Sequence, residues 1–298
     1  MATLVSNFMS SNVTEAAKTR LERSCGPPPG DWIGHAPAQA GIERIEAYFA
    51  GHAYEPHRHD TYALGYTISG IQSFSYRGAQ ADSRRGNAMI LHPDEVHDGR
   101  AGADQGFRYR MAYIEPRLIA DALGGRTNAL PFVRNAVSSD PSLLTAIRRA
   151  LADLDRPLEP LECDKIVAAI ADALLALDLS PPARRASATS ARAVDLARAF
   201  LDEHFMRTVA SEELEAVTGL DRYALARHFR IRLGTSPYRY LTMRRLDRAK
   251  SAIISGNSLV EAAFMSGFAD QSHMTRQFKR AFGLTPGHWH AIHLRDGP

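Results

Sequence analysis

The chain is poor in cysteine, with only Cys25 and Cys163 among its 298 residues. These two positions are far apart and fit neither the short ligand spacing of a zinc site nor the dense pattern of a disulfide scaffold. We therefore expect two reduced thiols. A redox-sensing pair is the alternative that this spacing leaves open.

Long apolar runs are missing as well. No stretch approaches the roughly 18 consecutive apolar residues that a membrane-spanning helix needs. The N-terminal residues lack the basic start and apolar core of a signal peptide. Nucleophile elbows, P-loops and HExxH zinc motifs are also absent from the sequence. These absences predict a cytoplasmic protein with no membrane partner, no cofactor and no enzymatic activity.

An internal repeat occupies the C-terminal part of the chain. Eight residues recur in the same order after a shift of 49 positions. The first copy contains Asp221, Leu225, Arg227, Phe229, Leu233, Gly234, Ser236 and Pro237, and the second contains Asp270, Met274, Arg276, Phe278, Phe282, Gly283, Thr285 and Pro286.

Each copy has the pattern of a short helix, a glycine turn and a longer helix. In the first copy, Ser211 is suited to begin the short helix and Gly219 to end it, and Asp221 is suited to cap the longer helix. The second copy repeats this pattern, with its turn at Gly267. This arrangement presents a second helix to the DNA major groove. Residues 240–254 between the copies are expected to form one connecting helix.

The uneven charge of the chain agrees with nucleic acid binding. The net charge is +3 overall, but residues from Ala191 onward carry 16 Lys and Arg against 11 Asp and Glu, whereas residues 1–190 have a net charge of −2. A basic C-terminal part favours contact with phosphates. The connecting helix adds four candidate phosphate contacts, which are Arg244, Arg245, Arg248 and Lys250.

The two copies read GLDRYALARHFRIRLGTSPYRYL and GFADQSHMTRQFKRAFGLTP. Together they resemble the double helix-turn-helix domain of the AraC family of bacterial transcription regulators. The resemblance implies a sequence-specific regulator whose partners are double-stranded promoter DNA, RNA polymerase and a second copy of the chain. It implies base-edge contacts for Tyr223, Arg227, Gln271, Ser272 and Arg276, and backbone contacts for Arg222, Arg230, His273, Thr275 and Lys279.

The first half of the chain has the pattern of an antiparallel β-domain. Residues 42–113 contain short alternating segments that are broken by Gly, Pro and Asp, as in a barrel or jelly roll. Turns are expected at Ser69-Gly70 and Arg77-Gly78, and further strands at residues 88–91 and 107–114. Helices are predicted over residues 115–124, 142–154 and 162–179, where apolar residues recur at helical spacing.

We therefore expect a two-domain α+β protein. Its cupin-like β-barrel with flanking helices covers residues 41–179, and its all-α domain with two helix-turn-helix motifs covers residues 191–298. Residues 1–40 are expected to form a loosely ordered lead-in, with a possible helix over residues 13–23. The small and polar residues 180–190 are expected to form the linker.

The predicted barrel resembles the cupin sensor domain of AraC-type regulators. Gly51, His57, His59 and Gly70 fit the spacing of the first cupin motif, and Gly86 and His97 fit the second. Ala63 replaces the glutamate of the metal-binding set. We expect the barrel lumen to bind a small organic effector through His57, His59, Tyr62, Tyr66, His92 and His97. A metal site formed by His57, His59 and His97 is the alternative.

Three functions are compatible with these patterns. The first is a transcription regulator that responds to the effector in the barrel. The second is a metal-dependent cupin enzyme, such as an oxygenase or isomerase, fused to a DNA-binding domain. The third is an architectural DNA-binding protein that needs no ligand.

Overall fold

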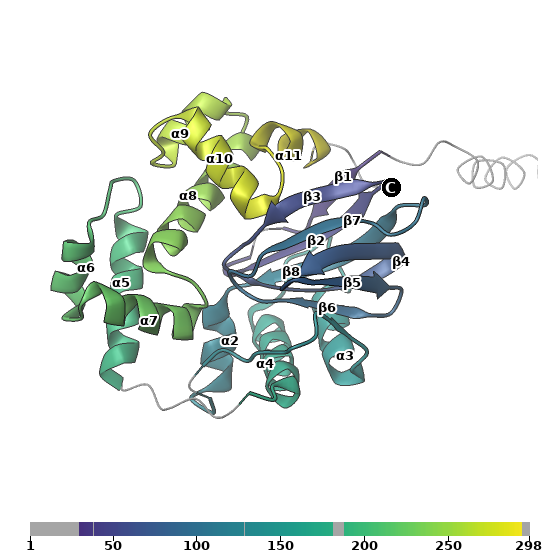
Figure 1. Ribbon diagram of the computed structural model, residues 1–298, viewed down its shortest axis with the longest axis horizontal. Helices are drawn as coiled ribbons and strands as arrows, with labels where there is room; N and C mark the ends of the chain where they lie inside the picture. The colour runs from purple at the N-terminus through teal and green to yellow at the C-terminus, as the bar shows by residue number, and fades with distance from the viewer. Residues whose placement is uncertain (1–29, 38, 128, 181–187, 294–298) are drawn as a thin grey trace, which may run out of the picture. The chain divides into compact units, whose positions relative to one another are not determined.

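The computed structural model describes residues 30–37, 39–127, 129–180 and 188–293 (Figure 1). The chain from Asp31 onward packs as one unit, in which a sheet-rich part precedes a helical part. The predicted α+β architecture is confirmed. The possible helix over residues 13–23, Cys25 and most of the predicted linker lie outside the described residues, and Cys163 is a free thiol.

Antiparallel pairing joins all the strands of the sheet-rich part. One series runs in the order β1 (Trp32–His35), β2 (Ile42–Phe49), β8 (Phe107–Ile114), β4 (Tyr62–Tyr76), β6 (Ala88–Leu91) and β9 (Val137–Ser138). A second group adds β3 (His52–His57), β7 (His97–Ala101) and β5 (Ala79–Arg84), in which β7 pairs with both β3 and β4. The strands predicted at residues 88–91 and 107–114 are confirmed.

Strand β4 joins the two groups of strands. Its first half pairs with β6 and β8, and its second half pairs with β5 and β7. The turn predicted at Ser69-Gly70 is therefore wrong, because the strand runs through this point with a bulge between Thr67 and Ser69. Gly70 has a φ of 73° and lies directly against the Gly106 carbonyl, so a glycine here bends the strand without ending it. The turn at Arg77-Gly78 is confirmed, with both φ angles positive.

Strand β1 lies within the segment expected to be a loosely ordered lead-in. Its register places Trp32 opposite Tyr48 and His35 opposite Ile45 on β2. Trp32 and Ile33 are buried. The structure corrects the expectation for residues 32–35, because burying these two side chains stabilises a short edge strand although the surrounding Gly and Pro residues predict irregular structure.

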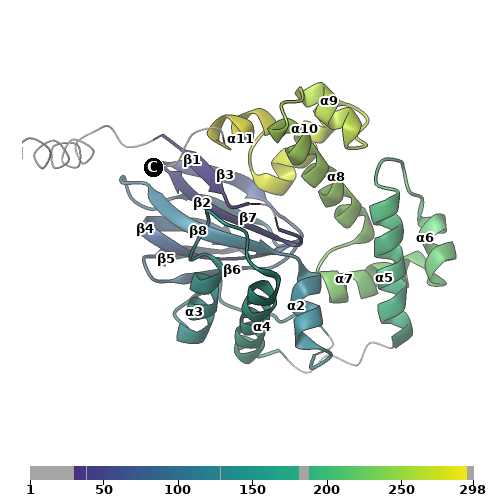
Figure 2. The ribbon, with the colours of Figure 1, turned by 180° about the vertical axis from the view of Figure 1, so that it is seen from behind.

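The two faces of the sheet belong to different hydrophobic cores. On β4, Tyr62 and Leu64 pack with the helices on the outer face, whereas Ala63 belongs to the core of the barrel interior. The outer face is covered by α2 (Pro116–Leu123), α3 (Pro141–Ala150) and α4 (Pro160–Leu177) (Figure 2). The three helices predicted from apolar spacing are thus confirmed, although α3 ends at Ala150.

The helical part contains α5 (Ala188–Glu203), α6 (Ser211–Thr218), α7 (Arg222–Leu233), α8 (Pro237–Ile254), α9 (Leu259–Met265), α10 (Gln271–Phe282) and α11 (Pro286–His293). Helix α8 is the connecting helix, and it begins before the predicted residue 240 because Ser236 caps it and Pro237 occupies its first turn. Helices α5, α6 and α7 share a separate core. The second helix-turn-helix motif instead shares one continuous core with the barrel interior.

Candidate DNA-reading helices and effector cavity

Helices α7 and α10 are the second helices of the two repeated units, and the sequence defines both ends of each. Asp221 accepts hydrogen bonds from the backbone nitrogens of Tyr223 and Ala224 at 2.9 and 3.0 Å, and Asp270 accepts one from His273 at 2.6 Å. Each helix ends at a left-handed glycine, Gly234 or Gly283. The repeat in the sequence is therefore a repeat of helix length and capping.

The two helices also expose equivalent positions. Residues 221–230 and 270–279 have the same pattern of buried, half-buried and exposed side chains, position by position. The buried residues form one stripe on each helix. Of the predicted DNA contacts, Arg222, Tyr223, Arg227, Arg230, Gln271, Ser272, Arg276 and Lys279 are exposed, and His273 and Thr275 are half-buried.

Some of these exposed side chains already have partners. Arg222 lies 3.4 Å from a carboxylate oxygen of Glu215, and Arg230 lies 3.6 Å from one of Asp94 in the barrel. Tyr223 is 77% exposed. Within the described residues, Arg276 and Lys279 form no ion pair, so both are available to an anionic partner.

The basic residues of α8 do not form a free phosphate-binding surface. Arg244 pairs with barrel carboxylates, and Lys250 lies 2.8 Å from both carboxylate oxygens of Glu43. Arg245 donates to the carbonyls of Phe205 and Arg207, and Arg248 lies over the ring of Phe205. The prediction of phosphate contacts is corrected for Arg244 and Lys250, because carboxylates of the barrel already pair with them. Arg248 is exposed and Arg245 half-buried, and for these two residues phosphate contact stays a prediction.

Helices α7 and α10 both meet the barrel at their C-terminal ends. The backbone nitrogens of Glu55 and Arg58 donate to the carbonyls of Gly283 and Arg280 at 3.2 and 3.1 Å. A side chain at Gly283 would lie within 2.8 Å of His57 Nδ1, and one at Gly234 would lie within 2.6 Å of Pro93. The N-terminal ends, which carry most of the predicted base contacts, are the exposed ends.

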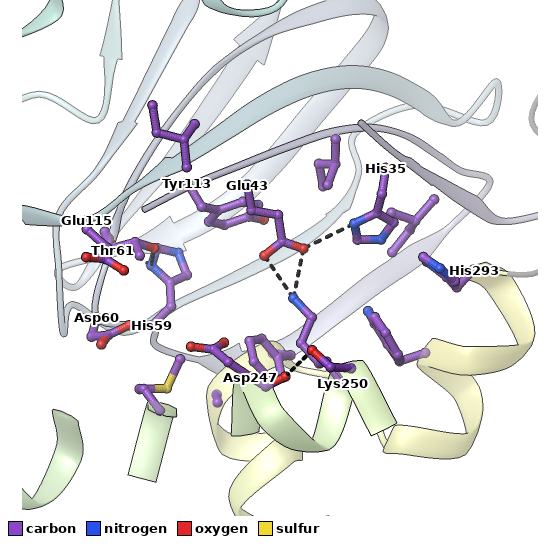
Figure 3. A pocket seen from close by; sticks show the side chains of 18 of the residues that line it. His35, Glu43, His59, Asp60, Thr61, Tyr113, Glu115, Asp247, Lys250 and His293 are labelled. Carbon is purple, nitrogen blue, oxygen red and sulfur yellow. Dashed lines mark hydrogen bonds and ion pairs between the residues drawn. The ribbon is translucent and has the colours of Figure 1, made fainter. Parts of the chain in front are cut away.

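A cavity of about 550 Å³ lies at the mouth of the barrel (Figure 3). One wall comes from the barrel and the loops beside it, and the other comes from α8, α10 and α11. Its apolar lining includes Ile33, Ile45, Met243, Phe282, Leu284 and Trp289. Deeper in the barrel, large side chains such as Phe49, Phe74 and Phe107 are fully buried in the core. The space open to a ligand is therefore at the mouth of the barrel, beside the helical part of the chain.

His57, His59 and His97 come together beside this cavity. The ring centroids of His57 and His59 lie 4.2 and 4.9 Å from that of His97. Each ring donates from Nδ1 to a backbone carbonyl two residues away, at 2.8 to 3.0 Å, which leaves Nε2 as the acceptor nitrogen. Burial lowers the pKa of all three, to about 4 for His97 and well below its usual range for His57 and His59.

The sequence grouped six effector contacts, and the structure separates them. His57 and His59 line the cavity and His97 lies against them, but Tyr62, Tyr66 and His92 are on the other face of the sheet. Tyr62 donates to the Pro131 carbonyl at 2.7 Å, and His92 accepts from the Val133 nitrogen at 3.0 Å. This separation corrects the predicted set. Successive side chains of a strand point to opposite faces of the sheet. Because Ala63 faces inward, Tyr62 and Tyr66 must face outward, away from the lumen.

Two groups of charged side chains, which sequence reasoning missed, also line the cavity. Glu43 is paired with Lys250 and lies 3.1 Å from His35 (Figure 3). Burial opposes its charge, but Lys250 and His35 hold the pKa of Glu43 below its usual range. Asp60, Glu115 and Asp247 surround Arg244. Because each group joins residues far apart in the sequence, no local spacing indicates it.

Among the described residues, no group of three or more His, Cys, Asp or Glu side chains is arranged to hold a metal ion. No helix in the described part of the chain has the length and apolar character to cross a membrane.

Family models match both parts of the chain. A model described as the AraC-like ligand binding domain matches residues 39–171, and one described as a helix-turn-helix domain matches residues 214–291. YbfI of Bacillus subtilis (strain 168), described as an uncharacterized HTH-type transcriptional regulator, is 26% identical over 77% of the chain and 86% of its own length. The HTH-type transcriptional activator RhaS of Klebsiella pneumoniae (strain 342) is 34% identical over 30% of the chain and 32% of its length.

Solved structures with the same two-part fold include ToxT from Vibrio cholerae. One ToxT structure has a TM-score of 0.60 and 9% identity over 86% of this chain and 100% of that one. Another, described as bound to an unsaturated fatty acid, has a TM-score of 0.57 and 10% identity over 90% of this chain and 98% of that one. At this identity the similarity concerns the fold.

Proposed function

We propose, since the chain belongs to the AraC family of transcriptional regulators, that it reads a specific promoter sequence with α7 and α10 together. The observation that carries this proposal is the equivalence of the two helices. They share capping, length and the order of exposed positions. Two such helices, joined by α8, would enter successive major-groove segments on one face of the DNA.

The exposed residues divide into two proposed roles. Arg276 and Gln271 are suited to bidentate contacts with guanine and adenine edges, and Tyr223, Arg227 and Ser272 would read bases beside them. Arg222, Arg230, His273, Thr275 and Lys279 would fix the position of the helices on the sugar-phosphate backbone. Arg222 and Arg230 would have to exchange the carboxylate partners described above for phosphates.

Substitution of Arg276 tests the reading role. We expect Arg276→Ala to weaken binding to the specific site by about 1 to 3 kcal/mol and to relax the preference at one base position, with little change on random DNA. Lys279→Ala is the matched control on the same exposed face. It should lower the affinity for all duplexes alike. It should also reduce the slope of affinity against salt concentration by the amount expected for about one phosphate contact.

The measurement is the dissociation constant for specific and random duplexes over a range of salt concentrations. The specific site would first be selected from a random pool with the unchanged protein. Equal losses on both duplexes for Arg276→Ala would reject its role as a base reader. Because both side chains are exposed, neither substitution should alter the thermal stability of the free protein.

We further propose that the effector binds the cavity at the barrel mouth. ToxT, which has the same fold, is described as bound to an unsaturated fatty acid, so a ligand of organic character is compatible with this architecture. In this chain, α8, α10 and α11 supply one wall of the cavity. A ligand there would touch the sensor and the DNA-binding helices at once, and it would shift the arrangement of the reading helices if its affinity differs between the arrangements.

The remaining parts of the proposal are a homodimer on adjacent sites and contact with RNA polymerase. A dimer would double the number of reading helices on the promoter. Sedimentation of the full chain with and without the selected duplex would measure this state. A monomer at every concentration, free and on DNA, would contradict it.

A further inference from the structure

The charges of the cavity are unbalanced at one end. Arg244 lies 3.0 Å from Asp60, 3.2 Å from Glu115 and 3.3 Å from Asp247, measured from its guanidinium nitrogens to their carboxylate oxygens. One cation is therefore shared by three carboxylates. Burial, only partly opposed by Arg244, raises the pKa of Asp60. Loss of hydration at the cavity wall raises the pKa of Asp247 to about 6, although its side chain is 46% exposed. This cluster, which we call the Arg244 cluster, holds an excess of negative charge when ionised.

Other cations compensate this excess only in part: Lys250 acts on Asp247, Arg239 acts on Asp60, and Arg117 lies 4.0 Å from Glu115. At the opposite end, Lys250 is matched by Glu43, whose two carboxylate oxygens it contacts at 2.8 Å (Figure 3). His57, His59 and His293 cannot supply positive charge at neutral pH, because burial lowers the pKa of His57 and His59 well below the usual range and that of His293 to about 4. The cavity therefore has two carboxylates more than it has cations.

Two hydrogen-bond acceptors at the acidic end lack partners. Asp60 is 4% exposed, and its Oδ1 atom has no hydrogen bond, while its Oδ2 faces Arg244. His59 is also 4% exposed, and its Nε2 is unpaired, whereas its Nδ1 donates to the Thr61 carbonyl. Buried polar atoms normally have partners. Both residues line the cavity, and both atoms are buried without a donor among the described residues.

We propose that the effector of this cavity is an organic cation, an amine whose ammonium group binds Asp60 and His59 and whose apolar body lies toward α10 and α11. This inference rests on the proposed function, in which the cavity is the effector site. An ammonium group supplies both the missing positive charge and the N–H donors that the two acceptors need. The apolar wall of Ile33, Ile45, Met243, Phe282, Leu284 and Trp289 suits an aromatic or branched body.

A carboxylate ligand fits this cavity poorly, although ToxT is described in complex with a fatty acid. It would add negative charge beside three carboxylates, and Lys250 is already engaged by Glu43. Arg244 Nε is a buried donor without a partner, but the rest of the guanidinium is surrounded by acids. A neutral oxygen on the ligand could accept from this nitrogen without adding charge.

Three probes with one carbon skeleton test the proposal. Phenylpropylamine, phenylpropanol and phenylpropanoic acid would each be titrated into the full chain at neutral pH, with the melting temperature and the heat of binding as readouts. We expect the amine to raise the melting temperature, the alcohol to raise it less, and the acid to leave it unchanged. Stabilisation by the acid equal to or above that by the amine, or no shift with the amine, overturns the proposal.

Variants locate the site. Asp60→Asn and Asp247→Asn should each lower the affinity for the amine by about tenfold or more, because each removes a negative charge from the Arg244 cluster. Asp121→Asn, which removes an exposed carboxylate on α2 outside the cavity, should leave the affinity unchanged. If Asp60→Asn does not fold, Asp247→Asn decides alone, since its side chain is half-exposed. Unchanged amine affinity in the folded cavity variants overturns the proposal.

DNA binding by the same preparations shows whether a negative result concerns the proposed ligand class or the proposed regulator function. If the unchanged protein selects a specific duplex but binds no amine, the ligand class is wrong and the regulator function stands. If no duplex is preferred over random DNA, the proposed function itself fails, whatever the probes do.

Discussion

Alanine at position 44 is expected to lower the free energy of unfolding by about 3 kcal/mol, because it removes a buried cation and three hydrogen bonds, one of them to a buried carbonyl. Arg44 on β2 is 2% exposed. Its guanidinium donates to the carbonyls of Ala150, Asp153 and Arg156 at 3.3, 2.8 and 2.6 Å. These carbonyls lie at the end of α3 and in the loop after it, where the helix dipole is also negative. Arg44 thus attaches the helical layer to the sheet.

Chemical unfolding of the full chain would measure this loss. Arg44→Lys keeps the charge but not the fork of donors, so it should lie between the alanine variant and the unchanged protein. Arg126→Ala, which breaks an exposed ion pair with Asp172 on α4, should cost no more than about 1 kcal/mol. An Arg44→Ala variant as stable as Arg126→Ala would show that the three carbonyls find water or relax, contrary to this account.

The sequence carried enough local information to predict the two repeated units. Their capping residues and apolar stripes act within one or two turns of helix, so Asp221, Leu225 and Phe229 defined their own surroundings. The bend in β4 was not predictable in the same way. Ser69-Gly70 is suited to a tight turn, and only the tertiary pairing with β8 makes the chain continue through it as a bulged strand. Strand β1 likewise depends on a partner strand.

The effector site was predictable only in part. The cupin-like spacing of His57, His59 and His97 correctly placed three rings together, because the strands of the two motifs pair and put His57 on β3 opposite His97 on β7. Parity within β4 could have excluded Tyr62 and Tyr66, since Ala63 already occupied the inward position. The Arg244 cluster was beyond sequence reasoning, because its arginine is on α8 and its partners Asp60 and Glu115 are in the barrel domain. Helix α8, whose basic residues suggested phosphate contacts, packs against the barrel through Arg244 and Lys250.

Acidification is expected to destabilise the protein strongly. Burial lowers the pKa of His92, His97 and His293 to about 4, and those of His57 and His59 well below 6.5. The unfolded chain therefore binds more protons than the folded chain between about pH 6.5 and pH 4, and stability falls as the pH falls through this window. The raised pKa values of Asp60 and Asp247 act in the opposite direction.

The size of the effect follows from the difference in bound protons. Four buried histidines, which are His57, His59, His92 and His97, gain protons on unfolding near pH 5 while the buried Asp60 loses one. The net uptake of about three protons corresponds to a loss of about 4 kcal/mol per pH unit, and the more exposed His293 and Asp247 add little because solvent screens them. Urea unfolding at a series of pH values from neutral to pH 5 would measure the slope. Stability that stays level or rises on acidification would contradict the burial of uncharged histidines in this fold.

Two substitutions should change this slope in opposite directions. His92→Phe removes one buried imidazole, so the decrease in the free energy of unfolding on acidification should become shallower by about 1.4 kcal/mol per pH unit. The two hydrogen bonds that this substitution also removes change the stability at neutral pH but not this slope. Asp247→Asn removes a carboxyl that takes up a proton in the folded state as the pH falls through about 6. Without this carboxyl, the free energy of unfolding should decrease more steeply as the pH falls. The same substitution should raise stability at neutral pH, because the folded state then no longer holds an excess carboxylate beside Arg244. If acid acted only through the overall surface charge, the two variants would not change the dependence of stability on pH in opposite directions.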